Sequence, residues 1–223
     1  AGYGYPSNAH YFEYLQVASV NGTTVTFNSP LKHTYKSTWP NYNSGNQFEV
    51  DNGGPGTLYA LHPSWDTEVE YQGLTFTFTG GQTYANGRTA TFRDVTVTSG
   101  ALIPTASQTW SLINSDMSGS YVEVDKLVST LNITNSTFKS IDFQSSSIDL
   151  VNMTGSRVIT FMNGTPKKFV GSNNQFNGTM GVGTLYYGRT ESFSCTNCTI
   201  GTFRTFGYSI DANPFSMANG VIT

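Results

Sequence analysis

The chain has 223 residues, a formal net charge of −3 at pH 7, and only 11% charged residues. The lack of a basic run argues against nucleic-acid binding, and no apolar stretch reaches the length of about 18 residues that crosses a bilayer. Scarce charge combined with abundant Gly, Thr, Ser and Asn is typical of β-rich extracellular or virion proteins. We therefore expect an extracellular or virion location, with no nucleic-acid partner and no membrane insertion.

Residues 1–66 carry no regular repeat and are predicted to form an entry module. Within it, residues 17–27 are predicted to form a β-hairpin, because Asn21-Gly22 is a strong two-residue turn signal between two runs rich in β-branched residues. Residues 32–56 are predicted to form a long irregular loop. Loops of this length are usually functional or pack over an end of the structure.

From residue 67 to the end, one pattern recurs every 18 to 24 residues. Each repeat is centred on a residue type that tolerates a left-handed backbone in a tight turn. The eight turn positions are Gly73, Asp94, Asn114, Asn135, Gly155, Asn173, Asn197 and Asn219. Residues four before, two before and three after each turn are apolar at 23 of 24 positions. The first two of these positions have period two, so they share one face of a strand and are predicted to face a core.

A unit of about 20 residues cannot bury its apolar face alone and must stack on its neighbours. The repeat therefore predicts an all-β fold in which residues 67–223 form a parallel β-helix of about eight coils. A β-sandwich, the alternative, has strands spaced by about 8–12 residues and does not predict an in-phase repeat of this length. Because the last turn lies close to Thr223, we expect the native protein to continue or another chain to cover the open edge.

Two cysteines, Cys195 and Cys198, flank the seventh turn. The repeat predicts that Cys195 fills an inward position and that Cys198 lies beside the turn, both as ordinary structural residues. A local disulfide is the alternative. A redox motif would need a helix after a strand, and a zinc site would need two further ligands that the distant His residues do not supply. We therefore expect no metal and no cofactor.

Two segments carry a resemblance to a known family. VASVNGTTVTFNSPLKHTY at residues 17–35, then EVEYQGLTFTF at 68–78 and the coils, resemble the pectate-lyase-like right-handed parallel β-helix superfamily. In character the chain looks most like the β-helix spike and fibre proteins of phages, which are commonly trimers. The resemblance covers roughly residues 14–223 and implies a right-handed β-helix. It implies little about activity, because this fold hosts lyases, hydrolases, epimerases and non-enzymatic spikes.

The catalytic motifs that the resemblance implies are missing. The sequence lacks the Asn-Thr-Asp, Gly-His-Gly and Arg-x-Lys motifs of polygalacturonase-type hydrolases and the Asp-Pro-His-Asp motif of mannuronan epimerases. Paired carboxylates on neighbouring coils could still hydrolyse a glycosidic bond, although solvated charges on an outer face are the simpler explanation. The weak catalytic candidates are Glu123, Asp125, Asp142, Asp149 and Glu191. Among them, Glu123 and Asp142 are predicted to be neighbours on one face.

Aromatic residues make up 14% of the chain, and several do not fit inward positions. Exposed aromatic rings can stack on sugars, whereas the alternative is packing under loops or between subunits. The glycan-binding candidates are Trp39, Tyr42, Trp65, Tyr84, Tyr186 and Tyr187. The leading hypothesis is a non-catalytic β-helix of a virion spike or fibre that binds a surface polysaccharide or glycan receptor, assembled as a homotrimer or larger. A secreted polysaccharide lyase or glycosidase and a cell-surface adhesin are the alternatives.

Overall fold

The computed structural model describes residues 13–31, 61, 65–85, 87–104, 107–124, 128–143, 148–163, 166–182, 192–205 and 215–223. The predicted loop 32–56 lies outside these residues. Strands β1 (Val17–Asn21) and β2 (Thr24–Phe27) pair antiparallel around Gly22, whose φ is 57°. No helix in the described part of the chain is long and apolar enough to cross a membrane.

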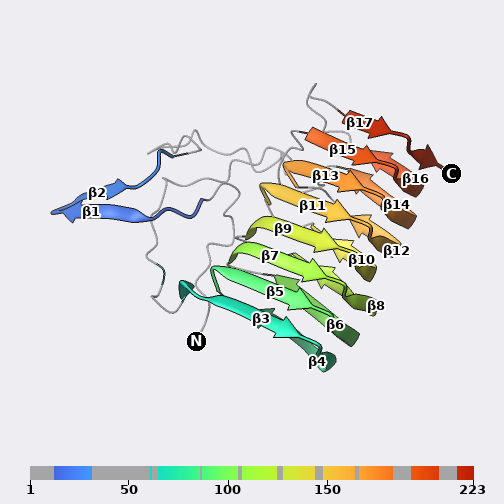
Figure 1. The fold of residues 1–223 in the computed structure, drawn as a ribbon, viewed down its shortest axis with the longest axis horizontal. Coiled ribbons are helices and arrows are strands. Elements are labelled where there is room, and N and C mark those ends of the chain that lie inside the picture. The colour runs from blue at the N-terminus through green and yellow to red at the C-terminus, as the bar shows by residue number, and fades with distance from the viewer. Residues whose placement is uncertain are drawn as a thin grey trace, which may run out of the picture.

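The remaining strands form a β-solenoid made of two eight-stranded parallel sheets (Figure 1). The first sheet contains β3 (Glu68–Gln72), β5 (Thr89–Arg93), β7 (Ser107–Ile113), β9 (Val128–Thr134), β11 (Leu150–Thr154), β13 (Lys168–Ser172), β15 (Ser192–Thr196) and β17 (Phe215–Ala218). The second sheet contains β4 (Thr75–Ala85), β6 (Thr96–Pro104), β8 (Asp116–Glu123), β10 (Thr137–Asp142), β12 (Arg157–Asn163), β14 (Gln175–Val182), β16 (Thr199–Thr205) and β18 (Val221–Ile222). The chain alternates between the sheets, so each strand except those at the two ends pairs with strands one coil before and one coil after it.

The predicted all-β parallel solenoid is confirmed, with a correction to its length. It makes about six turns, not about eight. The difference lies at the ends, where the pairs β3–β4 and β17–β18 have a neighbouring coil on one side only. Val221 and Ile222 on the last strand are accordingly 55% and 53% exposed. The buried core extends from Ala90 to Ile200, across the six strand pairs between these ends.

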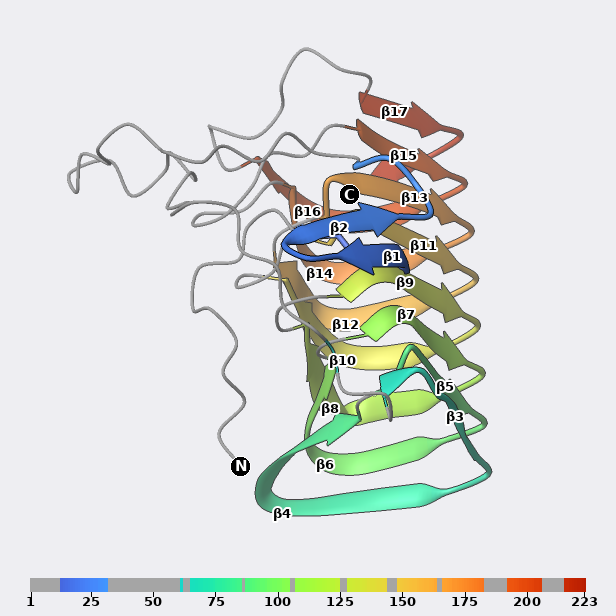
Figure 2. The same ribbon diagram turned by 90° about the vertical axis from the view of Figure 1, so that its left-hand side faces the viewer.

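All eight predicted turn positions have a left-handed backbone, with φ between 49° at Asn135 and 64° at Gly73. The turns stack along one edge of the solenoid (Figure 2). Polar side chains link successive turns: Asn114 Nδ2 donates to Asp94 Oδ1 at 3.3 Å, and Asn197 Nδ2 donates to Asn173 Oδ1 at 3.1 Å. The Asn and Asp residues therefore satisfy two requirements, the backbone conformation and a ladder of side-chain hydrogen bonds, whereas Gly73 and Gly155 satisfy only the first.

The inward positions fill a continuous core of aliphatic and aromatic side chains. Rings on successive coils stack: Phe169 and Phe193, which are in register, have centroids 5.0 Å apart. Phe92 and Trp110, at different inward positions of adjacent strands, have centroids 4.9 Å apart. The indole Nε1 of buried Trp110 donates to Ser107 Oγ at 3.0 Å, so its polar atom is satisfied. Stacking at the coil spacing thus buries large side chains without leaving a polar group unpaired.

A column of four buried polar side chains lies inside the turns, each one residue after a turn position: Ser115, Ser136, Ser156 and Asn174. The backbone nitrogen of each member donates to the side-chain oxygen of the next: Ser115 to Ser136 at 3.0 Å, Ser136 to Ser156 at 3.0 Å, and Ser156 to Asn174 at 2.9 Å. Each Ser hydroxyl donates in turn to the carbonyl two residues before it, at 2.8 to 3.0 Å. The column satisfies backbone groups that burial would otherwise leave unpaired.

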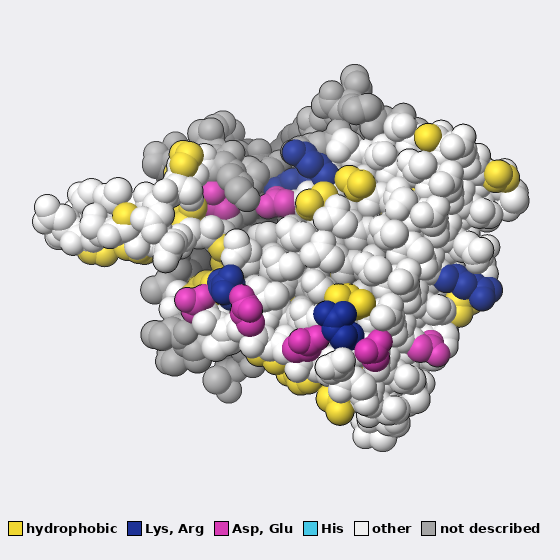
Figure 3. Space-filling view, viewed as in Figure 1, with side chains coloured by type: hydrophobic (Ala, Val, Ile, Leu, Met, Phe, Trp, Pro, Cys, Tyr) yellow, Lys and Arg dark blue, Asp and Glu magenta, His cyan; other side chains and the backbone are white. Residues whose placement is uncertain are grey.

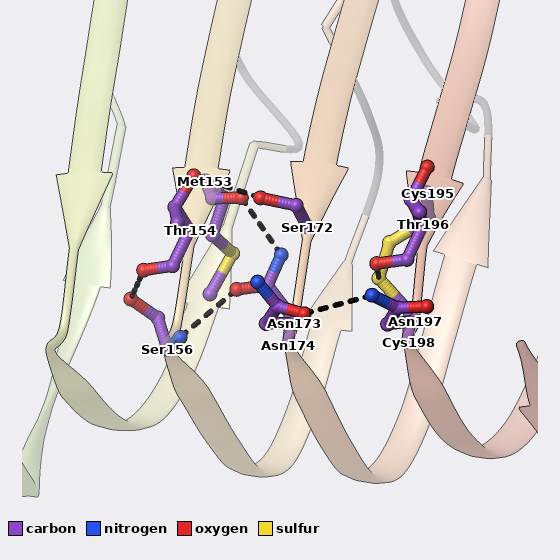
Figure 4. Close-up of a disulfide and its surroundings, with 10 residues drawn as sticks. All are labelled: Met153, Thr154, Ser156, Ser172, Asn173, Asn174, Cys195, Thr196, Asn197 and Cys198. Atoms are coloured by element: carbon purple, nitrogen blue, oxygen red, sulfur yellow. Dashed lines mark hydrogen bonds between the residues drawn. A yellow bond between two sulfur atoms is a disulfide. The ribbon is translucent and has the colours of Figure 1, made fainter. Parts of the chain in front are cut away.

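A disulfide follows this column on the next coil (Figure 4). Cys195 is fully buried at its inward position and Cys198 is buried beside the turn, which confirms their predicted placement. The structure joins them in a bond across Asn197, so the alternative of a local disulfide is correct and the expectation of two ordinary core residues is wrong. The seventh coil is therefore closed covalently across its own turn.

Candidate functional site

Two strands of the second sheet, β8 and β12, each carry one outward aromatic residue in their second half. Tyr121 on β8, Ser140 on β10 and Phe161 on β12 are in register on three successive coils. Tyr121 and Phe161 are 37% and 38% exposed, whereas Ser140 between them is 4% exposed. Coils are stacked about 4.8 Å apart, so the two rings flank a small residue across two coil spacings. Two partly exposed aromatic rings therefore lie on either side of the buried Ser140.

A polar group lies two residues further along the same strands. Glu123, Asp142 and Asn163 are in register, so the predicted neighbours Glu123 and Asp142 lie on adjacent coils. Asn163 Nδ2 donates to Asp142 Oδ1 at 3.4 Å. All three side chains are partly exposed, and both carboxylates have further partners. Carboxylate oxygens accept and an amide nitrogen donates, so this group matches both halves of a sugar hydroxyl.

The bend in the second sheet carries exposed side chains on the other side of the aromatic pair. Lys139 and Ile159 are exposed there, Ile159 at 36%. The side-chain amide of Asn177 lies against the guanidinium of Arg157 on the neighbouring coil. With its oxygen turned toward Arg157, it accepts from Nη2 at 2.6 Å and from Nε at 3.0 Å. This side of the molecule therefore combines aromatic, acidic, amide and basic side chains.

The outward face of the first sheet has a different chemistry. It faces the viewer in Figure 3 and is largely uncharged. Small polar residues occupy equivalent positions on successive strands, such as Thr91, Ser111 and Asn132. Its cations near β3 are neutralised: Arg88 bonds Asp66 and Glu68, and Arg93 bonds Glu70, all at 2.7 to 2.8 Å. Hydrogen bonding to Asp66 is the main cause that raises the pKa of Arg88.

The remaining acidic candidates do not join this group. Asp149 forms a salt bridge of 2.7 Å with Lys167, whose side chain is only 9% exposed. The pair lies just before β11 and β13, where the two residues precede their strands on adjacent coils. Removing one partner would leave a charge with little access to water, so we assign Asp149 a structural role. Asp125 and Glu191 lie outside the described residues.

The aromatic candidates named from the sequence are not brought together among the described residues. Trp65 stacks on Tyr14, with ring centroids 4.7 Å apart, and is partly buried. The backbone of Tyr84 pairs with Ile103 in the second sheet, and the position of its side chain is not described. The candidates outside the described residues are Trp39, Tyr42, Tyr186 and Tyr187. The described aromatic pair is thus a different one, Tyr121 and Phe161.

Sequence reasoning missed this pair because the strand bends contain different numbers of residues. Three residues separate Met117 from Tyr121, but one separates Phe138 from Ser140. A count of residues forward from each turn therefore does not identify which residues pair after the bend. The strand ends do carry a signal in the sequence. Each ends in a buried apolar residue followed by a polar one, in the tripeptides Tyr-Val-Glu at 121–123, Ser-Ile-Asp at 140–142 and Phe-Met-Asn at 161–163.

Among the described residues, no group of three or more His, Cys, Asp or Glu side chains could hold a metal ion. No protein-family model, no curated protein and no solved structure matches the chain.

Proposed function

We propose that the solenoid binds a glycan on the outward face of the second sheet. The observation that supports this most directly is the exposed pair Tyr121 and Phe161 flanking Ser140, with polar side chains two residues further along. Aromatic rings bury large apolar areas at little conformational cost, and the apolar faces of sugar rings provide such areas. A few polar groups beside an apolar contact fix the orientation of a ligand.

The acidic and amide side chains supply the directional contacts in this proposal. Glu123 and Asp142 accept hydrogen bonds from sugar hydroxyls, and Asn163 donates to a ring or hydroxyl oxygen. All sit on strands that are hydrogen-bonded on both sides. A rigid strand surface limits the conformational entropy lost on binding. The repeating coil spacing suits an extended chain of sugars more than a single monosaccharide.

The test is a glycan array followed by titration of any glycan that binds, with product analysis. We expect binding without new reducing or unsaturated ends. Tyr121→Ala and Phe161→Ala should each weaken binding by about tenfold or more, since buried aromatic contacts dominate interface energies. Val170→Ala is the control, because Val170 is 50% exposed on the first sheet. Equal loss in all three variants, or binding unaffected by both aromatic variants, would exclude this site.

Hydrolysis of a glycosidic bond is the second candidate function. It is motivated by the register of Glu123 and Asp142 on adjacent coils. Two carboxyl groups about 5–10 Å apart can act as acid and as nucleophile or base on one sugar. New reducing ends that disappear in both Glu123→Gln and Asp142→Asn would establish this activity in place of simple binding. Products that persist in both variants would show contamination.

We further propose an extracellular protein of the virion spike or fibre type, assembled as a homotrimer, with a cell-surface adhesin as the alternative. The resemblance described above motivates the spike assignment. The disulfide between Cys195 and Cys198 supports an oxidising location, because structural disulfides are rare in reducing compartments. Analytical ultracentrifugation tests the trimer: a single species at the monomer mass across micromolar concentrations would contradict it.

A further inference from the structure

A lysine amine and a carboxyl group meet where two adjacent strands of the first sheet begin, with little access to water. The side chain of Lys167 is 9% exposed and that of Asp149 is 23% exposed. The Nζ atom of Lys167 donates to Oδ1 of Asp149 at 2.7 Å. The other salt bridges among the described residues join exposed arginines to exposed acids. Within the described part of the chain, this is therefore the one ion pair in which a largely buried primary amine contacts a carboxyl group.

The backbone holds the two residues against each other. Asp149 directly precedes β11 and Lys167 directly precedes β13, and these two strands pair in register. The backbone nitrogen of Lys167 donates to the carbonyl of Ile148 at 2.9 Å, and that of Lys168 donates to the carbonyl of Asp149 at 3.0 Å. The two hydrogen bonds lie on either side of the pair and fix the approach of one residue to the other. Two groups of one chain that are held in this way react far faster than the same groups free in solution.

Burial favours an uncharged form of this pair. Ile148 precedes Asp149 and Pro166 precedes Lys167, and both of these apolar residues are buried. Taking two charges out of water carries a desolvation penalty, which their mutual attraction offsets only in part unless the geometry is very good. An amide made from the same two groups carries no charge and avoids this penalty. The surroundings therefore shift the balance between an ion pair and a neutral condensed product toward the condensed product.

We propose that Lys167 and Asp149 condense to an amide, which links two successive coils covalently. The ammonium of Lys167 gives one proton to the carboxylate across the 2.7 Å hydrogen bond, which leaves a neutral amine beside a carboxylic acid. The nitrogen lone pair then attacks Cγ of Asp149 and forms the C–N bond. A nitrogen at hydrogen-bond distance from a carboxyl oxygen lies close to the reactive range of about 3–3.5 Å from its carbon.

The step is completed within the pair. A second proton passes from the nitrogen to a hydroxyl of the tetrahedral intermediate, the C–O bond to that hydroxyl breaks, and one water molecule leaves. The reaction consumes no other reactant. Its product joins the coil of β11 to that of β13, next to the coil that the Cys195–Cys198 disulfide closes. The proposal does not depend on the glycan site, which lies on the second sheet.

The experiment is intact-mass spectrometry of the full chain, unfolded in denaturant with a reductant. Denaturant separates an ion pair but leaves an amide intact, and the reductant opens the disulfide. We expect the main species to be lighter than the sequence mass by one water molecule. A tryptic digest then locates the loss. Trypsin cleaves after Arg157, so the segments that carry Asp149 and Lys167 stay together only if the amide joins them.

The test variant is Lys167→Arg, because a guanidinium preserves the ion pair but stays charged and does not attack a carboxyl carbon. This variant should have its full sequence mass. The matched control is Lys168→Arg, which changes the exposed neighbouring lysine and should still lose one water molecule. Wild-type protein whose main species has the full sequence mass would overturn the proposal, whether or not the variants fold. A loss of water that persists in Lys167→Arg, or that the digest places on other residues, would also overturn it.

Discussion

The sulfur of Cys195 occupies the space that a side chain at Gly171 would need. A Cβ placed on Gly171 would lie 2.7 Å from Cys195 Sγ, 2.7 Å from Cε1 of Phe169 and 3.0 Å from Nδ2 of Asn174. The two residues are in register on adjacent strands, β13 and β15. Gly171 is the one inward position of the repeat that is not apolar, and the disulfide on the next coil fills the volume that it leaves.

Gly171→Ala is therefore expected to destabilise the protein by about 1–3 kcal/mol, the usual cost of overpacking a core. Part of this cost should disappear when Cys195→Ala and Cys198→Ala are introduced together, because the crowding sulfur is gone. Urea unfolding of the four proteins in the cycle measures the coupling. Purely additive effects would show that Cys195 does not limit the space at residue 171.

Reduction of the Cys195–Cys198 bond should lower the free energy of unfolding by about 2 kcal/mol. The bond closes a four-residue loop, for which the loss of unfolded-state entropy is small. Urea unfolding with and without a reductant measures the difference. The matched control is the double variant with both cysteines replaced by Ala, whose stability should not respond to the reductant. An equal response of that variant would mean that the reductant acts elsewhere.

Ser136→Ala should destabilise the protein by about 1–3 kcal/mol. The substitution removes the acceptor for the buried backbone nitrogen of Ser115, which donates to Ser136 Oγ at 3.0 Å. Ser118→Ala, at an exposed position on the strand of the preceding coil, should change stability by less than about 0.5 kcal/mol. Equal stability of the two variants would refute the assigned role of the buried column.

Asn135→Ala should be less stable than Asn135→Gly by about 1 kcal/mol, although alanine is normally the better residue in regular structure. Both variants lose the bond from Asn135 Nδ2 to Asn114 Oδ1, so their difference isolates the left-handed backbone with φ of 49°. Thermal unfolding of both variants measures it. An Ala variant as stable as the Gly variant would show that the turn relaxes away from this conformation.

The turn ladder and the inward positions could be predicted from sequence because each is tied to residue type at a fixed offset. A left-handed φ selects Asn, Asp or Gly, and stacked coils repeat the same inward positions. The serine column was missed although its members follow their turns directly, as Ser115 and Ser136 do. A Ser beside a turn has an obvious local explanation, and only the stacking of coils reveals the bond between them. The count of turns differed because terminal strand pairs do not enclose a core.

The candidate site was predicted only in part. Glu123 and Asp142 were predicted to be neighbours and are in register, although they lie nine and seven residues after their turns and so do not share one offset. Tyr121 and Phe161 were not predicted as a pair, because the bends that precede them contain extra residues. Three residues separate Met117 from Tyr121, whereas two separate Val158 from Phe161. The sequence also did not reveal that Lys139, Arg157 and Arg204 form no salt bridge among the described residues, since this depends on which acids lie within reach.

The buried column of Ser and Asn also has a direction along the chain. The backbone nitrogens of Ser115, Ser136 and Ser156 each bond to a side-chain oxygen supplied by the next member of the column, which comes later in the sequence. During synthesis from the N-terminus, a newly made coil therefore holds an unsatisfied nitrogen until its successor has formed. In this part of the solenoid we therefore expect ordered structure in the growing chain to form one coil behind the newest coil made.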